Sequence, residues 1–175
     1  MHTIHRLSAR EFADGVKGLA EVLADAVDDG SSLGFVHPFD RDAAAAWWRT
    51  QAPAVADGSL AVWVCRDGGG ISGTVGLALP AKPNARHRAE VVKLAVHRDA
   101  RGRGVGRALL ATVQEAAAAA GATLLILDTE TGSAAERLYL SDGWTRYGVV
   151  PRYAADPAGA LRDCSFFYKE LATTS

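Results

Sequence analysis

The sequence predicts an α/β protein in which a central mixed sheet, mostly antiparallel and of six to seven strands, carries helices on both faces. A strand, a helix and a strand follow one another across residues 89–129, which predicts a parallel pair joined by a crossover. Two strand patterns, 60–66 and 71–79, flank a glycine turn, as in an antiparallel hairpin. A sheet with both kinds of pairing is most simply covered by helices on both faces.

The N-terminal third begins with an alternating strand pattern at residues 3–7. Ser8 opens a capping box, which predicts a helix that runs to about Asp28 with apolar residues at helical spacing. A glycine- and serine-rich segment then interrupts the pattern. Asp40 is a good N-cap for a second helix, which we expect to cover residues 41–56.

The rest of the chain alternates strand and helix and ends in two strands. The strand 123–129 is almost entirely apolar, so we expect it to be buried on both faces. The predicted elements are a strand at 89–96, a helix at 104–120 closed by Gly121, a strand at 123–129, a helix at 133–141, and strands at 144–150 and 161–170.

Length and composition limit the possible functions. A chain of 175 residues is long enough for one compact domain, and we expect residues 1–175 to form it. The net charge of −1 argues against nucleic acid as a partner. Because no apolar run approaches about 20 residues and the N-terminus does not resemble a signal peptide, we expect no membrane partner and a cytoplasmic protein. The cysteines, Cys65 and Cys164, favour buried free thiols over a disulfide, and no Cys/His spacing indicates a metal.

The turn at residues 101–107, RGRGVGR, combines glycines and arginines just before a helix. A strand, a glycine turn and a helix N-terminus together bind phosphate, because free amides and the helix dipole favour an anion. The spacing does not match a P-loop. It fits a dinucleotide fingerprint poorly, although Asp128 lies where a ribose-binding acid would stand, so a nucleotide-dependent oxidoreductase stays a weaker alternative.

Two motifs carry a resemblance to a known family. Residues 101–106, R-x-x-G-x-G, resemble the coenzyme A pyrophosphate loop Q/R-x-x-G-x-G/A of the GNAT family of N-acetyltransferases. Residues 135–144 match that family's A-x-x-x-Y-x-x-x-G-F/W motif. The order of the elements is also similar, and the likeness covers residues 60–170. The stretch 127–139 looks most like the tabtoxin-resistance-type members.

The resemblance implies how acetyl-CoA would bind. Backbone groups of Leu94 and Val96 would meet the pantetheine arm and the acetyl carbonyl, and amides of the loop would hold the pyrophosphate. The family has an asparagine that contacts the coenzyme, and its position falls on Gly132 in this sequence. This side-chain contact is therefore missing or is made by the neighbouring Ser133. The implied coenzyme-binding residues are Leu94, Ala95, Val96, Arg101, Gly102, Arg103, Gly104, Val105, Gly106, Arg107 and Ser133.

Two residues take catalytic roles by the same resemblance. Tyr139 falls on the position of the general acid, and a phenol has a pKa close to that of the departing thiol. Glu90 falls where some members have the base that deprotonates the amine. The alternatives are a half-buried core tyrosine and an exposed strand-end glutamate paired to Arg86, Arg88 or Lys93.

Other side chains would line the acceptor side. Asp128 and Glu130 end a strand, where they could bind a cationic amine, and we expect one of them to cap the following helix instead. Trp47 and Trp48 are adjacent on a helix, so we expect one in the core and the other towards the acceptor. In the family, the loop that corresponds to residues 31–39 closes over the acceptor.

The expected function is transfer of the acetyl group of acetyl-CoA directly to a primary amine, which we expect to belong to a small molecule, without a metal. Neither cysteine lies in a matched motif, which argues against an acyl-enzyme. The alternatives are a coenzyme A-binding regulatory domain without catalysis and an acetyltransferase of protein N-termini or lysines. The identity of the amine and the existence of a homodimer stay open.

Overall fold

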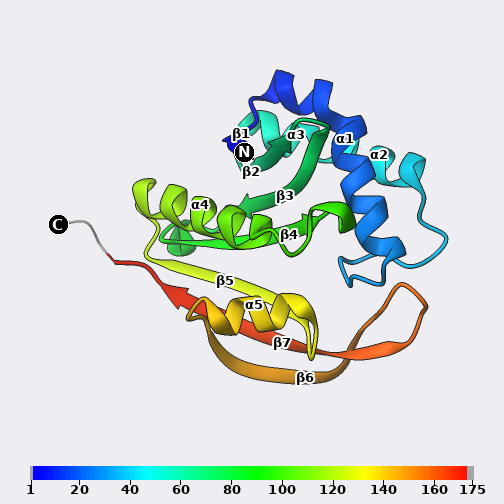
Figure 1. The fold of residues 1–175 in the computed structure, drawn as a ribbon. Coiled ribbons are helices and arrows are strands. Elements are labelled where there is room, and N and C mark those ends of the chain that lie inside the picture. The colour runs from blue at the N-terminus through cyan, green and yellow to red at the C-terminus, as the bar shows by residue number, and fades with distance from the viewer. Residues whose placement is uncertain (1, 173–175) are drawn as a thin grey trace.

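The computed structural model describes residues 2–172, which form a mixed seven-stranded sheet with helices packed against it (Figure 1). The strand order is β1-β2-β3-β4-β5-β7-β6. Strands β4 and β5 pair in parallel, and the other neighbours pair antiparallel. The predicted fold class is confirmed.

The elements lie close to their expected positions. The strands are β1 (Thr3–Arg6), β2 (Leu60–Asp67), β3 (Gly70–Ala78), β4 (Arg88–Val96), β5 (Leu124–Glu130), β6 (Thr145–Ala155) and β7 (Leu161–Glu170). The helices are α1 (Ala9–Asp28), α2 (Arg41–Thr50), α3 (Ala52–Asp57), α4 (Val105–Ala119) and α5 (Ala134–Ser141), with short 3-10 turns at Pro83–Ala85 and Arg98–Ala100.

Side-chain caps begin the first two helices as predicted. The Ser8 hydroxyl accepts a hydrogen bond from the Glu11 amide at 3.2 Å, and the Ser8 amide donates to the Glu11 carboxylate at 2.8 Å. The Asp40 carboxylate accepts from the Ala43 amide at 2.8 Å. The single helix predicted over 41–56 is wrong. It breaks into α2 and α3 because Pro53 has no amide hydrogen for the preceding turn and its ring crowds that turn.

Alternate residues of β2 enter two separate cores, which explains the helices on both faces of the sheet. Leu60, Val62 and Val64 pack with α1 and α2 in one core. Ala61, Trp63 and Cys65 face the opposite way and pack with α4 and α5 in the other. A fully buried valine or leucine side chain contributes about 1.5–3 kcal/mol, so this alternation holds both layers to the strand.

The expectation that β5 is buried on both faces is wrong. Leu125 and Leu127 are buried, whereas Leu124 and Ile126 are only partly covered. Helices α1 and α3 pack on β2, β3 and β4, so the face of β5 on their side has no helix over it.

Strand β6 continues beyond its predicted end. The expected strand 144–150 runs through Pro151 to Ala155, because β6 lies at the edge of the sheet, where a residue without an amide hydrogen is tolerated. Both cysteines are buried and free, as expected.

Candidate active site

A bulge in β4 opens the sheet beside β5. Lys93 and Leu94 together stand opposite the single residue Val75 of β3, and Lys93 has a φ of 51°. The parallel ladder between β4 and β5 ends at Glu90 and Ile126. Beyond this point β4 has an edge towards β5 that is not part of the ladder, and a site can form at the C-terminal ends of the two strands.

The N-terminus of α4 exposes free amides next to this opening. Gly104 is the N-cap, and both glycines of the exposed segment 102–104 have left-handed backbones, with φ values of 73° and 77°. The Ala108 amide bonds the Gly104 carbonyl at 2.9 Å, so the amides of 105–107 precede the first complete helical turn. Gly106 has no left-handed backbone, and a Cβ there would meet its neighbours at ordinary contact distances. The helix start suits a phosphate group.

The arginines of the loop turn towards other elements. Arg101 donates from Nε to the Val96 carbonyl at 3.1 Å and pairs with Asp29 at the end of α1. Arg107 donates to the Ser141 hydroxyl of α5 at 2.7 Å. Arg103 is exposed. The anion site therefore relies on backbone amides more than on these guanidinium groups.

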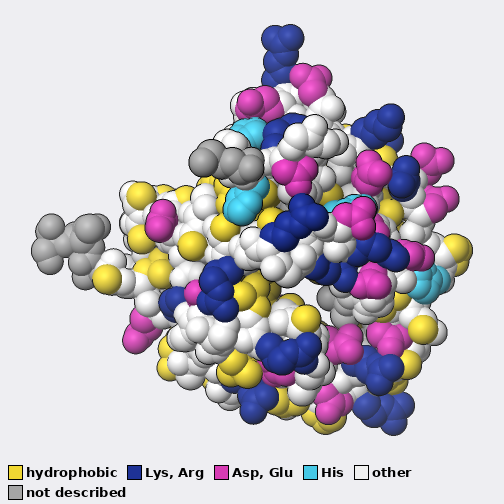
Figure 2. All heavy atoms as spheres, in the orientation of Figure 1, with side chains coloured by type: hydrophobic (Ala, Val, Ile, Leu, Met, Phe, Trp, Pro, Cys, Tyr) yellow, Lys and Arg dark blue, Asp and Glu magenta, His cyan; other side chains and the backbone are white. Residues whose placement is uncertain are grey.

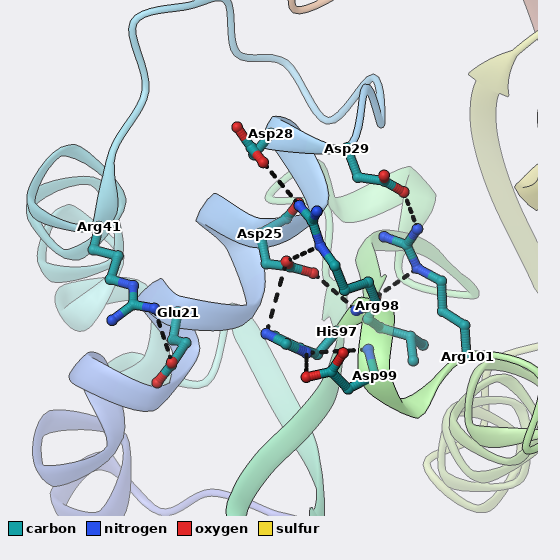
Figure 3. A network of polar contacts seen from close by, with 10 residues as sticks. Glu21, Asp25, Asp28, Asp29, Arg41, His97, Arg98, Asp99 and Arg101 are labelled. Carbon is teal, nitrogen blue, oxygen red and sulfur yellow. Dashed lines mark hydrogen bonds and ion pairs between the residues drawn. The ribbon is translucent and has the colours of Figure 1, made fainter.

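A cluster of ion pairs fastens the loop to α1 (Figure 3). The Asp25 carboxylate accepts from the Arg98 amide at 2.8 Å and from its Nε at 2.5 Å, and Arg98 also reaches Asp28 at 2.8 Å. His97 Nε2 lies 3.7 Å from the same Asp25 carboxylate. These contacts fix where α4 begins relative to α1. Elsewhere on the face in Figure 2, basic and acidic side chains are intermixed.

A cavity of about 360 Å³ lies where β4 and β5 separate. It brings together side chains from both ends of the chain. Among them are the two predicted catalytic residues, Glu90 and Tyr139, and two predicted coenzyme-binding residues, Leu94 and Ser133. Its lining residues include Ser31, Gly34, Glu90, Lys93, Leu94, Asp128, Glu130, Ser133, Tyr139, Tyr153, Arg162 and Cys164. Ala95 instead packs its side chain against α1, between Val22 and Ala26.

Tyr139 is held rigidly at the wall of this cavity. Its residue is 5% exposed, and its ring lies 5.9 Å from the ring of Trp144 and 6.0 Å from that of Phe167. Burial raises the pKa of the Tyr139 phenol well above its usual value, and the Asp128 charge raises it further. The phenol therefore carries its proton at physiological pH, as a proton donor requires, but in this structure its pKa lies above that of the departing thiol, which the sequence analysis expected it to match.

Glu90 is half-buried in the same cavity. Burial raises the pKa of the Glu90 carboxyl, and Asp128 raises it further, against the opposing charges of Lys93 and Arg88. Within residues 2–172, no basic side chain lies within 4.0 Å of the Glu90 carboxylate, so the alternative that pairs it with a nearby arginine or lysine is wrong. A carboxylate with a raised pKa can accept a proton from an amine or a water.

The cap of α5 differs from the prediction. The Ser133 hydroxyl accepts from the Glu136 amide at 3.1 Å, and the Glu136 carboxylate accepts from the Gly132 amide at 2.5 Å. The expectation that Asp128 or Glu130 caps this helix is therefore wrong. Because Ser133 caps the helix, both carboxylates remain free to face the cavity.

The first residues of the segment 31–39, Ser31–Gly34, line the cavity. The His37 amide bonds the Pro157 carbonyl at 2.8 Å, which links this segment to the connection between β6 and β7. As predicted, one tryptophan is core: Trp48 is 1% exposed, whereas Trp47 is partly exposed. Residues from both ends of the chain thus enclose the cavity.

Two cavity residues were missed from the sequence. Lys93 places its ammonium 5.6 Å from the ring centre of Phe35 and 5.3 Å from that of Trp47. Burial lowers the pKa of Lys93, against the raising effect of Asp128 and Glu90. The Cys164 thiol donates to the Asp128 carboxylate at 3.4 Å, and burial raises its pKa to about 12. The sequence signal for Lys93 was a charged residue within an otherwise apolar strand. No local sequence signal marked Cys164 as a cavity residue.

Residues 2–172 lack two further features, a membrane-spanning helix and a metal cluster. None of the helices is both long and apolar enough to cross a membrane. In the same residues, no group of three or more His, Cys, Asp or Glu side chains is arranged to hold a metal ion.

Known proteins resemble the chain in sequence. The sequence model of the Acetyltransferase (GNAT) family matches residues 19–144. N-acetyltransferase 8B of Rattus norvegicus is 37% identical over 97 residues, which are 54% of this chain and 43% of that protein. N-acetyltransferase 8 of the same species has the same identity and coverage. The matched part spans less than half the length of these relatives.

Solved structures resemble it along nearly the whole chain. Ribosomal-protein-alanine N-acetyltransferase from Brucella melitensis has a TM-score of 0.76 and 25% identity, covering 97% of this chain and 99% of that one. The protein yncA of Salmonella typhimurium, solved with its cofactor acetyl-CoA, has a TM-score of 0.75 and 22% identity, covering 100% and 96%, and shares the fold. The family match covers most of the chain and agrees with both sequence motifs and with the splayed sheet. The chain therefore belongs to the acetyltransferase (GNAT) family.

Proposed function

We propose that this protein transfers the acetyl group of acetyl-CoA directly to the primary amine of a small molecule, with residues 1–175 as one transferase domain. The observation that carries the proposal is the meeting of Glu90 and Tyr139 at one cavity beside the open N-terminus of α4. The α4 amides suit the pyrophosphate, and the edge of β4 beyond its ladder with β5 suits the pantetheine arm at Leu94, whereas the Val96 carbonyl already accepts a hydrogen bond from Arg101.

The reaction needs one proton acceptor and one proton donor. Glu90, directly or through a water, takes a proton from the ammonium form of the acceptor, and the free amine attacks the thioester carbonyl. The C–N bond forms, the C–S bond breaks, Tyr139 gives its proton to the departing thiolate, and the new amide nitrogen releases its remaining extra proton to water. The phenol is then restored from solvent, while amide groups of β4 face the developing oxyanion.

Cys164 faces the cavity and raises the question of a covalent acetyl-enzyme. A thiol with a pKa of about 12 is ionised at pH 8 in only about one molecule in ten thousand. Its hydrogen bond to Asp128 also favours the protonated form. Direct transfer is the better account, and Cys164→Ala is expected to keep turnover.

The enclosure favours a small acceptor over a protein. The bond between His37 and Pro157 bridges the segments that close the cavity, so a polypeptide acceptor would have to pass beside this bridge. The likeness to ribosomal-protein-alanine N-acetyltransferase from Brucella melitensis supports the protein alternative.

One assay separates these functions. Release of thiol from acetyl-CoA is measured with a panel of small primary amines and, in parallel, with peptides that carry a free N-terminus or lysine. Release with small amines supports the proposal, and release with peptides alone contradicts it. Binding of acetyl-CoA without release for any acceptor would indicate a regulatory domain.

A further inference from the structure

The β4 bulge redirects one charged side chain. In a regular strand Lys93 would share a face with Val91, which is buried in the core beneath α4. The bulge instead turns Lys93 towards Phe35 and Trp47, on the same side of the sheet as Val92. A left-handed backbone at a lysine costs of order 1–3 kcal/mol and persists only where the surroundings hold it.

Lys93 is a partly buried cation without a carboxylate in direct contact. Its ammonium contacts two aromatic rings, and no carboxylate of residues 2–172 lies within 4.0 Å of it. Asp128 and Glu90 act on this charge only from a longer distance, so the partly buried ammonium favours an incoming anion that can bind it directly.

The same cavity carries the opposite charge near Tyr139. Glu90 and Asp128 line it together with Lys93, so acidic and basic groups face one cavity. This arrangement fits a ligand that carries both an ammonium and an anionic group.

A second cavity adjoins the first at Val92 and Lys93, which line both. It has a volume of about 290 Å³ and is walled mainly by apolar groups, among them Trp47, Trp48 and Leu60.

We propose that the acceptor is an α-amino acid with an apolar side chain, and that Lys93 is the residue that selects it. The carboxylate meets the Lys93 ammonium, the amine lies at Glu90, and the side chain enters the cavity lined by Trp47 and Trp48. The inference rests on the proposed acetyl transfer and adds the acceptor class to it.

The test compares acceptors that differ only in the carboxylate. We expect kcat/KM for L-phenylalanine to exceed that for L-phenylalaninamide and phenethylamine at least tenfold, and L-leucine to exceed its amide likewise. Glycine is expected to be a poor acceptor because it leaves the apolar cavity empty. Calorimetric titration of L-phenylalanine and its amide into the protein saturated with coenzyme A gives a readout without turnover.

Lys93→Met should lower the ratio of amino acid to amide from at least tenfold to about one, in kcat/KM and in binding. Lys93→Arg keeps the charge and should keep a preference for the carboxylate. Lys82→Met, on the exposed surface, is the matched control and should leave the ratio unchanged. Thermal melting with and without acetyl-CoA checks that each variant is folded.

The outcomes separate the two proposals. Acetylation of amides and simple amines as fast as the amino acids would overturn the acceptor class and leave acetyl transfer standing. An unchanged ratio in Lys93→Met would remove Lys93 from its role. If no amine releases thiol and L-phenylalanine does not bind, both proposals fail.

Discussion

The proposed coenzyme side and the proposed acceptor side of the cavity are built in different ways. The proposed coenzyme side comes from one continuous segment, 94–107, and offers mainly backbone groups at the start of α4. The proposed acceptor side is assembled from side chains of four separate segments, namely 31–34, 90–93, 128–139 and 153–164. The difference teaches that the coenzyme side depends on the local shape of the backbone, whereas the acceptor side depends on tertiary contacts between side chains. Variants of the two halves should therefore fail in different ways.

The largest expected effect is on the coenzyme side. Gly104→Asp should abolish binding of acetyl-CoA, because it places a side chain and a negative charge against the pyrophosphate site and strains a backbone with φ of 77°. The wild-type protein at 100 times the dissociation constant should gain about 2.7 kcal/mol from acetyl-CoA, seen as a raised Tm. The variant should gain nothing.

Gly121→Asp is the control for strain alone. Gly121 has φ of 89° at the far end of α4, so this variant carries a comparable backbone penalty away from the site. It should keep its stabilisation by acetyl-CoA. Stabilisation of Gly104→Asp as strong as that of the wild type would refute the loop assignment.

Tyr139→Phe tests the proposed proton donor, which lies in the wall of the cavity where the two halves meet. We expect kcat to fall about 100-fold or more, since general acid catalysis typically contributes 10²–10⁴-fold, while acetyl-CoA binds normally. Single-turnover kinetics and coenzyme binding measure the two effects separately. Tyr147→Phe, at an exposed tyrosine of β6, is the control, and wild-type turnover in Tyr139→Phe would exclude the general-acid role.

Glu90→Gln should have a smaller effect, about tenfold on kcat/KM, because solvent or a neighbouring carboxylate can take the proton instead. The pKa of Glu90 is raised, so the wild-type rate should increase with pH as this carboxyl loses its proton. The variant should lose that limb of the profile. An identical pH profile in both proteins would argue against Glu90 as the base.

The same substitution has a stability signature. The folded-state pKa of Glu90 is raised above the unfolded value, so its contribution to stability is present at low pH and is lost as pH rises through the folded pKa. Glu90→Gln should therefore be more stable than the wild type at neutral pH. The difference should shrink on acidification, and denaturant unfolding at several pH values measures it.

The smallest effects concern the link between α1 and the coenzyme loop. Asp25→Ala should lower the free energy of unfolding by about 1.5–3 kcal/mol, because its largely buried carboxylate holds two donors of Arg98. Asp28→Ala, which breaks an exposed pair with the same arginine, should cost about 1 kcal/mol or less. Equal losses in urea unfolding would contradict the ranking.

The sequence by itself determined most of the fold and the local shape of the glycine turn before α4. The capping box at Ser8, the strand periodicities and the glycine turn are local, because dihedral preferences and hydrogen bonds between near neighbours decide them. The family resemblance rested on such local motifs, and the family match confirmed it. The break at Pro53 was also a local signal, although the predicted helix ran through it.

Only the tertiary structure decided the acceptor side. The half-burial of Leu124 and Ile126 depends on which helices reach β5, and the contact of Lys93 with Phe35 and Trp47 depends on a bulge that strand periodicity does not encode. Cys164 comes beside Asp128 only when β5 and β7 pair. The physical reason is the same in each case: these contacts join residues far apart in the chain, and packing of the whole sheet brings them together.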